Sequence, residues 1–308
     1  MLSTPDGKLS TGRIGFDSQS RTAASMSNGD QQPARQTQPR GSRLSRLRSY
    51  CFFLPIVYLY TGILGTVSLL CSLFDGSGRL QHRVARVWAR IILKTVGIRV
   101  RVEGLEHLHP SQPGIYAANH LSAIDIPVLY ASLPGQFRIM AKRALFRYPF
   151  LGWYLKRSGQ IPIVFGDPHA SLRSLNRAGD ALRRGMPLVV FPEGGRSRSG
   201  QLQEFMGGAF YVAIRAQAPV VPMAIVGSYE LLPMNSFHMI PGEVVLSVGE
   251  PIPTAGLRLR DTERLTAQVR QVIAGLCDSR ATGIPQPNAN NEGEPSPVFN
   301  TQTPKETP

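Results

Sequence analysis

Between residues 97 and 280 short continuous apolar runs alternate with longer stretches that have helical periodicity. The short runs are typical of buried strands and the longer stretches of helices that cover a sheet. This alternation predicts an α/β fold, a single domain with a mixed sheet flanked by helices. The predicted strands are 98–102, 114–118, 137–141, 161–165, 188–191, 220–226 and 244–248, and the predicted helices are 124–132, 151–157, 169–184, 207–217 and 261–277.

The run 220–226 differs from the other apolar runs because prolines stand at positions 219 and 222. Proline has no N–H to donate to a neighbouring strand, so it is confined to sheet edges, strand starts and bulges. We therefore expect this segment to be an edge strand or an interrupted strand, with core packing as its ordinary role.

Residues 49–74 contain no charged side chain. A bilayer core needs about 20 apolar residues in a helix, so this run is long enough to span it. Arginines and lysines flank it on both sides, so the positive-inside rule selects no orientation. The run either spans the membrane or dips into it as a re-entrant or interfacial hairpin, with Pro55, Gly62 and Gly65 as possible bends.

Residues 79–96 follow as a basic amphipathic helix, with Trp88 and aliphatic residues at helical spacing and arginines between them. Such a helix lies on anionic headgroups or packs on the domain with a solvated basic face. Residues 46–96 are thus predicted to be an N-terminal membrane-docking helical segment. The polar residues 1–45 and 281–308 are predicted to be disordered tails.

The 308 residues include 34 Lys and Arg against 20 Asp and Glu, a net charge of +14. This excess indicates an anionic partner, such as nucleic acid, phospholipid headgroups or phosphorylated small molecules. Two of the three cysteines lie in the apolar run, which excludes a secreted disulfide framework. No His and Cys group has zinc spacing, so we expect no metal site.

His120 and Asp125 follow the predicted strand 114–118, at the kind of strand end where α/β proteins bind ligands. His can act as a general base, and a carboxylate would fix its tautomer. On a regular helix this spacing places the two about 140° apart. They can meet only if His120 lies in the loop and Asp125 in the first helical turn. Alternatively, Asp125 only complements a helix N-terminus.

A second motif, Phe191-Pro192-Glu193-Gly194-Gly195-Arg196-Ser197, follows the predicted strand 188–191. Its adjacent glycines allow close approach of a ligand to the backbone, and arginine suits phosphate. An ordinary solvated loop has a similar composition, so this motif alone leaves both interpretations open.

Taken in order, His120-x₄-Asp125, Phe191-Pro192-Glu193-Gly194-x-Arg196-Ser197 and Val221-Pro222 resemble the glycerolipid acyltransferase family, and within it the bacterial 1-acylglycerol-3-phosphate acyltransferases. The resemblance covers residues 84–252, within a predicted acyltransferase domain at 97–280. It implies transfer of an acyl group from acyl-CoA or acyl carrier protein to a lysophospholipid, which gives phosphatidic acid. It also implies a cytoplasmic membrane location with a cytoplasmic active site, and no cofactor.

The resemblance implies a role for each matching residue. His120 would be the base and Asp125 its orienting partner. Arg196 would hold the acceptor phosphate, together with Lys142, and Pro222 would line the acyl or donor side. Glu193 and Gly194 would shape the loop.

The sequence departs from the family pattern at four places, and two departures replace a cation near the expected phosphate site. They are Gly195 for Thr, Ala144 for an acid, Val164-Phe165 for Asp-Arg, and Met206 for Lys. A different acceptor, such as lyso-ornithine lipid, therefore stays open. A third alternative is a non-catalytic protein that binds anionic lipid or nucleic acid, although no nucleic-acid recognition motif is present.

Overall fold

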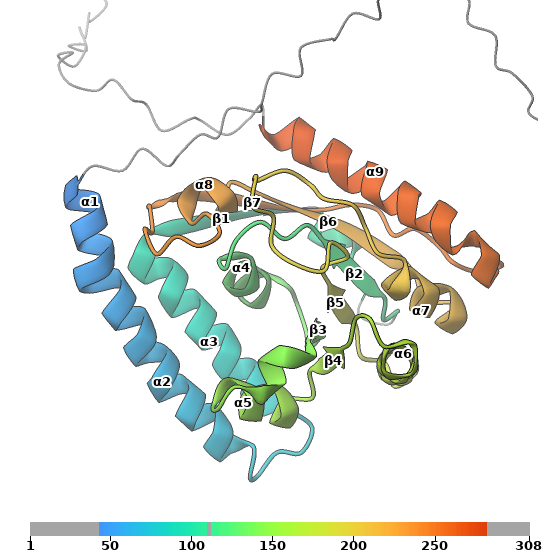
Figure 1. Ribbon diagram of the computed structural model, residues 1–308, viewed down its shortest axis with the longest axis horizontal. Coiled ribbons are helices and arrows are strands. Elements are labelled where there is room, and N and C mark those ends of the chain that lie inside the picture. Colours follow the sequence, from blue (N-terminus) through green and yellow to red (C-terminus); the bar gives the residue numbers. More distant parts are fainter. Residues whose placement is uncertain (1–42, 110–111, 282–308) are drawn as a thin grey trace, which may run out of the picture. The chain divides into compact units, whose positions relative to one another are not determined.

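The computed structural model describes residues 43–109 and 112–281. In this part of the chain the seven-stranded sheet has the order β1-β7-β6-β2-β5-β3-β4 (Figure 1). Strands β6 and β7 pair antiparallel and all other neighbours pair parallel, so the sheet is mixed, as predicted. The strands are β1 (Ile98–Glu103), β2 (Ile115–Ala118), β3 (Arg138–Lys142), β4 (Ile161–Ile163), β5 (Leu188–Val190), β6 (Val220–Val226) and β7 (Gly242–Val248).

Helices cover both faces of the sheet, and alternate residues of a strand face different layers (Figure 1). In β2, Tyr116 and Ala118 pack in the cluster that includes α3 and α4. Ile115 and Ala117 pack in the cluster that includes α6, α7 and α9. All four residues of β2 are therefore buried, which explains its continuous apolar run. The helices are α1 (Arg43–Arg48), α2 (Leu54–Cys71), α3 (Arg79–Val96), α4 (Asp125–Ser132), α5 (Leu151–Arg157), α6 (Pro168–Arg183), α7 (Gly208–Ala216), α8 (Ser228–Leu231) and α9 (Thr262–Ala281).

Strand β6 lies inside the sheet, between β7 and β2, so the edge-strand alternative was wrong and the interrupted-strand alternative is the one that applies. Its antiparallel partner ends at Val248, and the Gly249 N–H still donates to the Pro222 carbonyl oxygen. Val220 then pairs with Ile252. Five residues of β6, from Ala224 to Val220, therefore oppose six residues of the partner, from Ser247 to Ile252. The missing N–H of Pro222 thus falls at a bulge, where no regular ladder is lost.

The apolar segment forms one helical stretch that includes α1, a π-helical turn at Ser49–Phe53, and α2. Among the described residues it is the one helix long and apolar enough to cross a membrane, judged by length and composition alone. Only 6% of its most apolar window is buried, unlike a core helix. Exposed side chains along it include Tyr58, Leu59, Ile63 and Leu70.

No reversal occurs at Pro55, Gly62 or Gly65, because α2 continues through all three. The chain turns after α2, and α3 then packs beside it (Figure 1). The Asp75 carboxylate stabilises this turn by accepting hydrogen bonds from the backbone N–H of Ser77 and Leu80. The hydrogen bond from Leu80 is the main reason why the pKa of Asp75 falls to about 2.

Helix α3 packs between α2 and α4. Its apolar face therefore packs on the domain, which is one of the two arrangements expected from the sequence. Ala85, Ala89 and Val96 are buried on this face. The Trp88 indole N–H donates to the Thr61 hydroxyl of α2 at 2.9 Å. Arg79, Arg83 and Arg90 are exposed, whereas Arg86 is half-buried.

Residues 1–42 and 282–308, on which the two predicted tails fall, lie outside the described residues. Residues 43–45 were also assigned to the first tail, but they form the start of α1. Their helical state is supported by tertiary contacts: the Ser45 hydroxyl is 2.8 Å from His238 Nε2, and the Ser49 hydroxyl donates to the Met239 carbonyl.

His82 of α3 is buried against the rings of Tyr130 and Phe137, with centroid separations of 5.2 and 4.7 Å. Burial lowers the pKa of His82 to about 4, and the nearby charges of Arg86 and Arg138 add to this effect. In the folded protein the imidazole is therefore neutral at pH values where the unfolded chain, with an ordinary pKa of 6.5, binds a proton.

This difference predicts that the folded state loses stability as the pH falls from 6.5 towards about 4. A His82→Leu variant cannot bind this proton. The slope of its free energy of unfolding against pH should therefore be smaller by the contribution of about one proton. Denaturation in detergent over this pH range measures the slope. His109→Leu, which changes an exposed histidine, should keep the wild-type slope. An unchanged slope in His82→Leu would contradict the prediction.

Candidate active site

His120 and Asp125 meet at the end of β2, with 2.8 Å between His120 Nδ1 and Asp125 Oδ2. Strand β2 ends at Ala118, His120 lies in the following loop, and Asp125 is the first residue of α4. The loop turns the histidine back onto the start of the helix, which is the arrangement that their spacing requires. The imidazole is therefore oriented through Nδ1, and Nε2 is the ring nitrogen available to a ligand.

The Asp125 carboxylate is fully buried. Its Oδ2 accepts hydrogen bonds from the backbone N–H groups of Leu121 and Ser122, each at 2.8 Å, in addition to the contact with His120. These donors and the N-terminus of α4 stabilise a negative charge away from water. Asp125 therefore orients the imidazole and also accepts the backbone hydrogen bonds that hold the loop in place.

The second motif holds the backbone of His120 from both sides. Glu193 Oε1 accepts the His120 N–H at 2.7 Å, and the Ser197 N–H donates to the His120 carbonyl at 2.9 Å. The imidazole stacks on the ring of Phe191, with 4.0 Å between centroids and 20° between planes. Two segments far apart in the sequence thus position one histidine.

Glu193 is engaged with the protein rather than with the cavity. Its Oε2 accepts hydrogen bonds from the backbone and side-chain N–H groups of Gln203. Burial raises the pKa of Glu193, while the hydrogen bonds from His120 and Gln203 oppose this change. This carboxylate therefore acts on the site by shaping the loop and positioning His120.

Two polar residues close to His120, Asn119 and Ser122, form hydrogen bonds with backbone groups of the protein. Asn119, which sequence reasoning did not select, links β2 to β6 by a pair of hydrogen bonds with the backbone of Ile225. Its position directly before His120, at the end of a strand, could have indicated from the sequence that it belongs to the site. The Ser122 hydroxyl is buried and donates to the Leu232 carbonyl at 2.6 Å, so it does not face a substrate.

His120 lines a cavity of about 550 Å³ at the carboxyl ends of β2, β3, β4 and β5. Much of the wall is apolar, and Lys142, Gly194, Gly195 and Arg196 also line the cavity. A histidine and two cations therefore share one cavity with an apolar interior. The apolar lining includes Ile126, Ile139, Met140, Leu145, Ile163 and Val190.

Gly194 has a φ of +71°, and a Cβ there would overlap the terminal methyl of Met206. Phe165 lies beside the same position. The two residues that replace cations of the family pattern, Phe165 and Met206, therefore meet at this glycine. Lys142 Nζ lies 3.2 Å from the position that a Cβ at Gly195 would occupy, so the Lys142 side chain reaches this loop.

Of the predicted site residues, His120, Lys142, Gly194 and Arg196 line this cavity, whereas Asp125, Glu193 and Pro222 do not. Pro222 is buried in β6 and lies beside Gly249 and Leu276 of α9. Pro222 thus lies outside the lining of this cavity, and its role on the acyl or donor side stays a prediction. Among residues 43–109 and 112–281, no group of His, Cys, Asp or Glu could hold a metal ion.

Known proteins resemble the chain in sequence and in fold. Residues 99–226 match a family model described as Acyltransferase. A chloroplastic 1-acyl-sn-glycerol-3-phosphate acyltransferase of Brassica napus is 33% identical over 68% of this chain and 62% of its own length. A Chlamydomonas reinhardtii protein of the same name is 30% identical over 78% of this chain and 72% of its own length.

The crystal structure of PlsC, the 1-acyl-sn-glycerophosphate acyltransferase of Thermotoga maritima, covers 77% of this chain with 97% of its own. The TM-score is 0.67 at 25% sequence identity. The chain spans less than two thirds of the Brassica relative and more than two thirds of the Chlamydomonas relative. Sequence and fold agree, and the chain belongs to the glycerolipid acyltransferase family.

Proposed function

We propose that the protein transfers an acyl group from a thioester to the free hydroxyl of 1-acyl-glycerol-3-phosphate, which gives phosphatidic acid. The observation that carries the proposal is the His120–Asp125 pair, 2.8 Å apart, at the wall of an apolar cavity with two cations. Relatives with 30 and 33% identity bear the corresponding enzyme name, which supports the same reaction.

In the proposed mechanism, His120 Nε2 accepts the proton of the acceptor hydroxyl as its oxygen attacks the thioester carbonyl. Asp125 holds the Nδ1–H and stabilises the imidazolium that forms. When the carbon–sulfur bond breaks, the imidazolium returns the proton to the leaving thiolate. No metal or cofactor takes part, and the acyl chain occupies the apolar part of the cavity.

Arg196 and Lys142 are proposed to bind the acceptor phosphate. Both line the cavity that His120 lines, and Lys142 Nζ approaches the loop that carries Arg196. A guanidinium offers two parallel hydrogen bonds to phosphate, and an ammonium adds a point charge. Glu193 and Gly194 act indirectly, by setting the path of this loop.

The donor in this proposal is acyl-CoA or acyl carrier protein, and the enzyme acts at the cytoplasmic face of the inner membrane. The exposed apolar surface of α2 supports membrane attachment. Both thioester donors are made in the cytoplasm, which supports an active site that faces this compartment.

The proposed base predicts that His120→Ala lowers the rate of acyl transfer by about 10²–10⁴-fold, the usual contribution of a general base. Asp125→Asn should be nearly as slow, because it loses the charge that stabilises the imidazolium. Transfer from labelled palmitoyl-CoA to lysophosphatidic acid, with purified protein in detergent, measures both effects. Ser199→Ala, an exposed change in the nearby loop, is the control. Near-normal turnover by His120→Ala would refute the mechanism.

The proposed phosphate site predicts that Arg196→Ala raises the KM for lysophosphatidic acid by about tenfold, since hydrogen bonds to charged groups contribute about 1.5–3 kcal/mol. Arg198→Ala removes an exposed arginine of the same loop that does not line the cavity, and should leave this KM near the wild-type value. Initial rates against acceptor concentration distinguish the two variants, and an unchanged KM in Arg196→Ala would remove it from the phosphate site.

A second acceptor is favoured by Phe165 and Met206, which place apolar groups at Gly194 where the family pattern has cations. A lysolipid without a terminal phosphate, such as lyso-ornithine lipid, would not need those cations. Lyso-ornithine lipid and lysophosphatidylcholine therefore belong in the same assay. Product from these acceptors alone would retain the catalytic pair and change the substrate. No product with either donor would favour the non-catalytic, anionic-lipid-binding alternative.

The proposed membrane surface predicts that Leu59→Gln with Ile63→Gln weakens binding to lipid vesicles, because both side chains are exposed on α2. Leu259→Gln changes a leucine of similar exposure outside α2 and should bind like the wild type. Vesicle flotation measures the bound fraction. Equal binding by all three proteins would show that this face of α2 is not the docking surface.

A further inference from the structure

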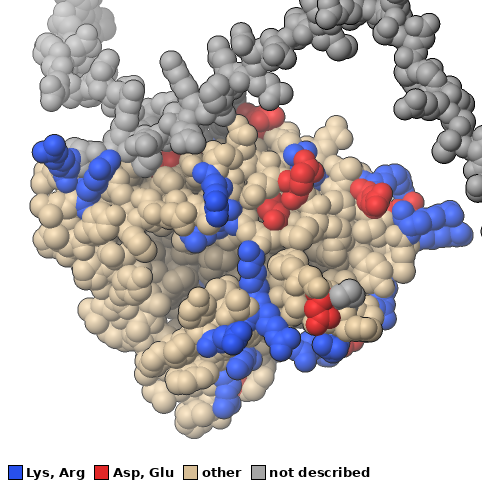
Figure 2. Space-filling view, viewed as in Figure 1, with Lys and Arg blue, Asp and Glu red and all other residues tan. Residues whose placement is uncertain are grey.

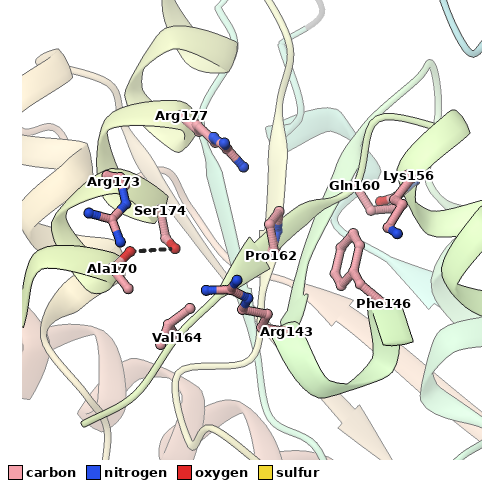
Figure 3. Close-up of a pocket in the computed structure, with 10 residues that line it drawn as sticks. All are labelled: Arg143, Phe146, Lys156, Gln160, Pro162, Val164, Ala170, Arg173, Ser174 and Arg177. Carbon is pink, nitrogen blue, oxygen red and sulfur yellow. Dashed lines mark hydrogen bonds between the residues drawn. The ribbon is translucent and has the colours of Figure 1, made fainter. Parts of the chain in front are cut away.

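A second cavity, of about 420 Å³, lies between α6, β4 and the segment that leads into α5 (Figure 3). Its floor includes Phe146, Pro162 and Val164. Four cationic side chains surround it: Arg143, Lys156, Arg173 and Arg177. We call this the four-cation pocket.

None of the ion pairs in the described part of the chain involves these four side chains. Figure 2 shows Lys and Arg gathered over the region between α5 and α6. Like charges around one concave surface repel each other, and a cleft with charges of one sign raises the local concentration of counter-ions. The pocket is therefore suited to a ligand with several negative charges.

The four-cation pocket shares two walls with the cavity of His120. Val164 of the segment after β4 lines both. On α6, Ser171 and Leu175 face the His120 cavity, whereas Arg173 and Arg177 face the pocket. A ligand in the pocket therefore lies on the other side of a wall that the segment after β4 and helix α6 form.

We propose that the four-cation pocket binds the phosphates of the acyl donor, the adenosine 3′,5′-bisphosphate end of acyl-CoA. This inference rests on the proposed acyl transfer. Arg196 and Lys142 are assigned to the acceptor phosphate, so a separate cluster remains for the donor. Arginine suits phosphate groups, and the apolar floor of Phe146, Pro162 and Val164 offers a contact surface for the adenine ring.

The kinetic test compares donors with and without phosphates. Arg143→Gln with Arg177→Gln should raise the KM for palmitoyl-CoA by about tenfold or more, because hydrogen bonds to charged groups are lost. The KM for lysophosphatidic acid should stay near the wild-type value, and the rate with S-palmitoyl-pantetheine should not change. The control, Arg99→Gln with Arg184→Gln, removes two exposed arginines that do not line the pocket. Equal losses with both donors would overturn the proposal.

Direct binding separates this proposal from the proposed reaction. Calorimetric titration with adenosine 3′,5′-bisphosphate should show binding to the full chain and to His120→Ala, and at least about tenfold weaker binding to the Arg143/Arg177 double variant. Arginine-dependent binding without any acyl transfer would retain the pocket and reject the reaction. Acyl transfer from CoA without such binding would reject the pocket alone.

Two further experiments would show whether the pocket binds an anionic ligand other than the donor phosphates. If the loss in the double variant depends on the anionic lipid content of phosphatidylcholine vesicles and not on donor phosphates, the pocket binds a lipid headgroup and the proposal is wrong. If the KM rises for palmitoyl-acyl carrier protein and not for palmitoyl-CoA, the pocket is instead a contact for an acidic carrier protein.

Discussion

The arrangement of the site depends on how one backbone unit, that of His120, is held between two strand ends. Its N–H donates to Glu193, its carbonyl accepts from Ser197, and its ring contacts Asp125 and Phe191. Strands β2 and β5 are parallel neighbours, so their carboxyl ends deliver both motifs to the same edge of the sheet. The parallel pairing therefore converts two distant sequence motifs into one positioned imidazole.

The two carboxylates of this arrangement are buried in different ways, and this separates their roles. Asp125 receives backbone donors and begins a helix, both of which stabilise its charge. Glu193 has a raised pKa because burial outweighs the hydrogen bonds that it accepts. The charge that supports the imidazole is thus that of Asp125, while Glu193 acts through the geometry of its loop.

Sequence patterns predicted all seven strands and the pairing of His120 with a helix-start Asp125, because periodicity and loop position are local properties. The central place of β6 was not predictable, because the cost of Pro222 depends on where its partner strand bulges. Spacing also could not reveal the four-cation pocket, whose members Arg143 and Arg177 come together only through the fold.

The two replaced cations of the family pattern and the four-cation pocket lie on different sides of the wall that β4 and α6 form. Phe165 and Met206 make the wall at Gly194 apolar on one side of β4 and α6, while Arg173 and Arg177 concentrate charge on the other. Val164 and α6 contribute to both surfaces, so the two groups of cations lie on opposite sides of one wall. Under the proposals above, the acceptor phosphate is assigned to Arg196 and Lys142, and the cations on the other side of the wall are assigned to the donor.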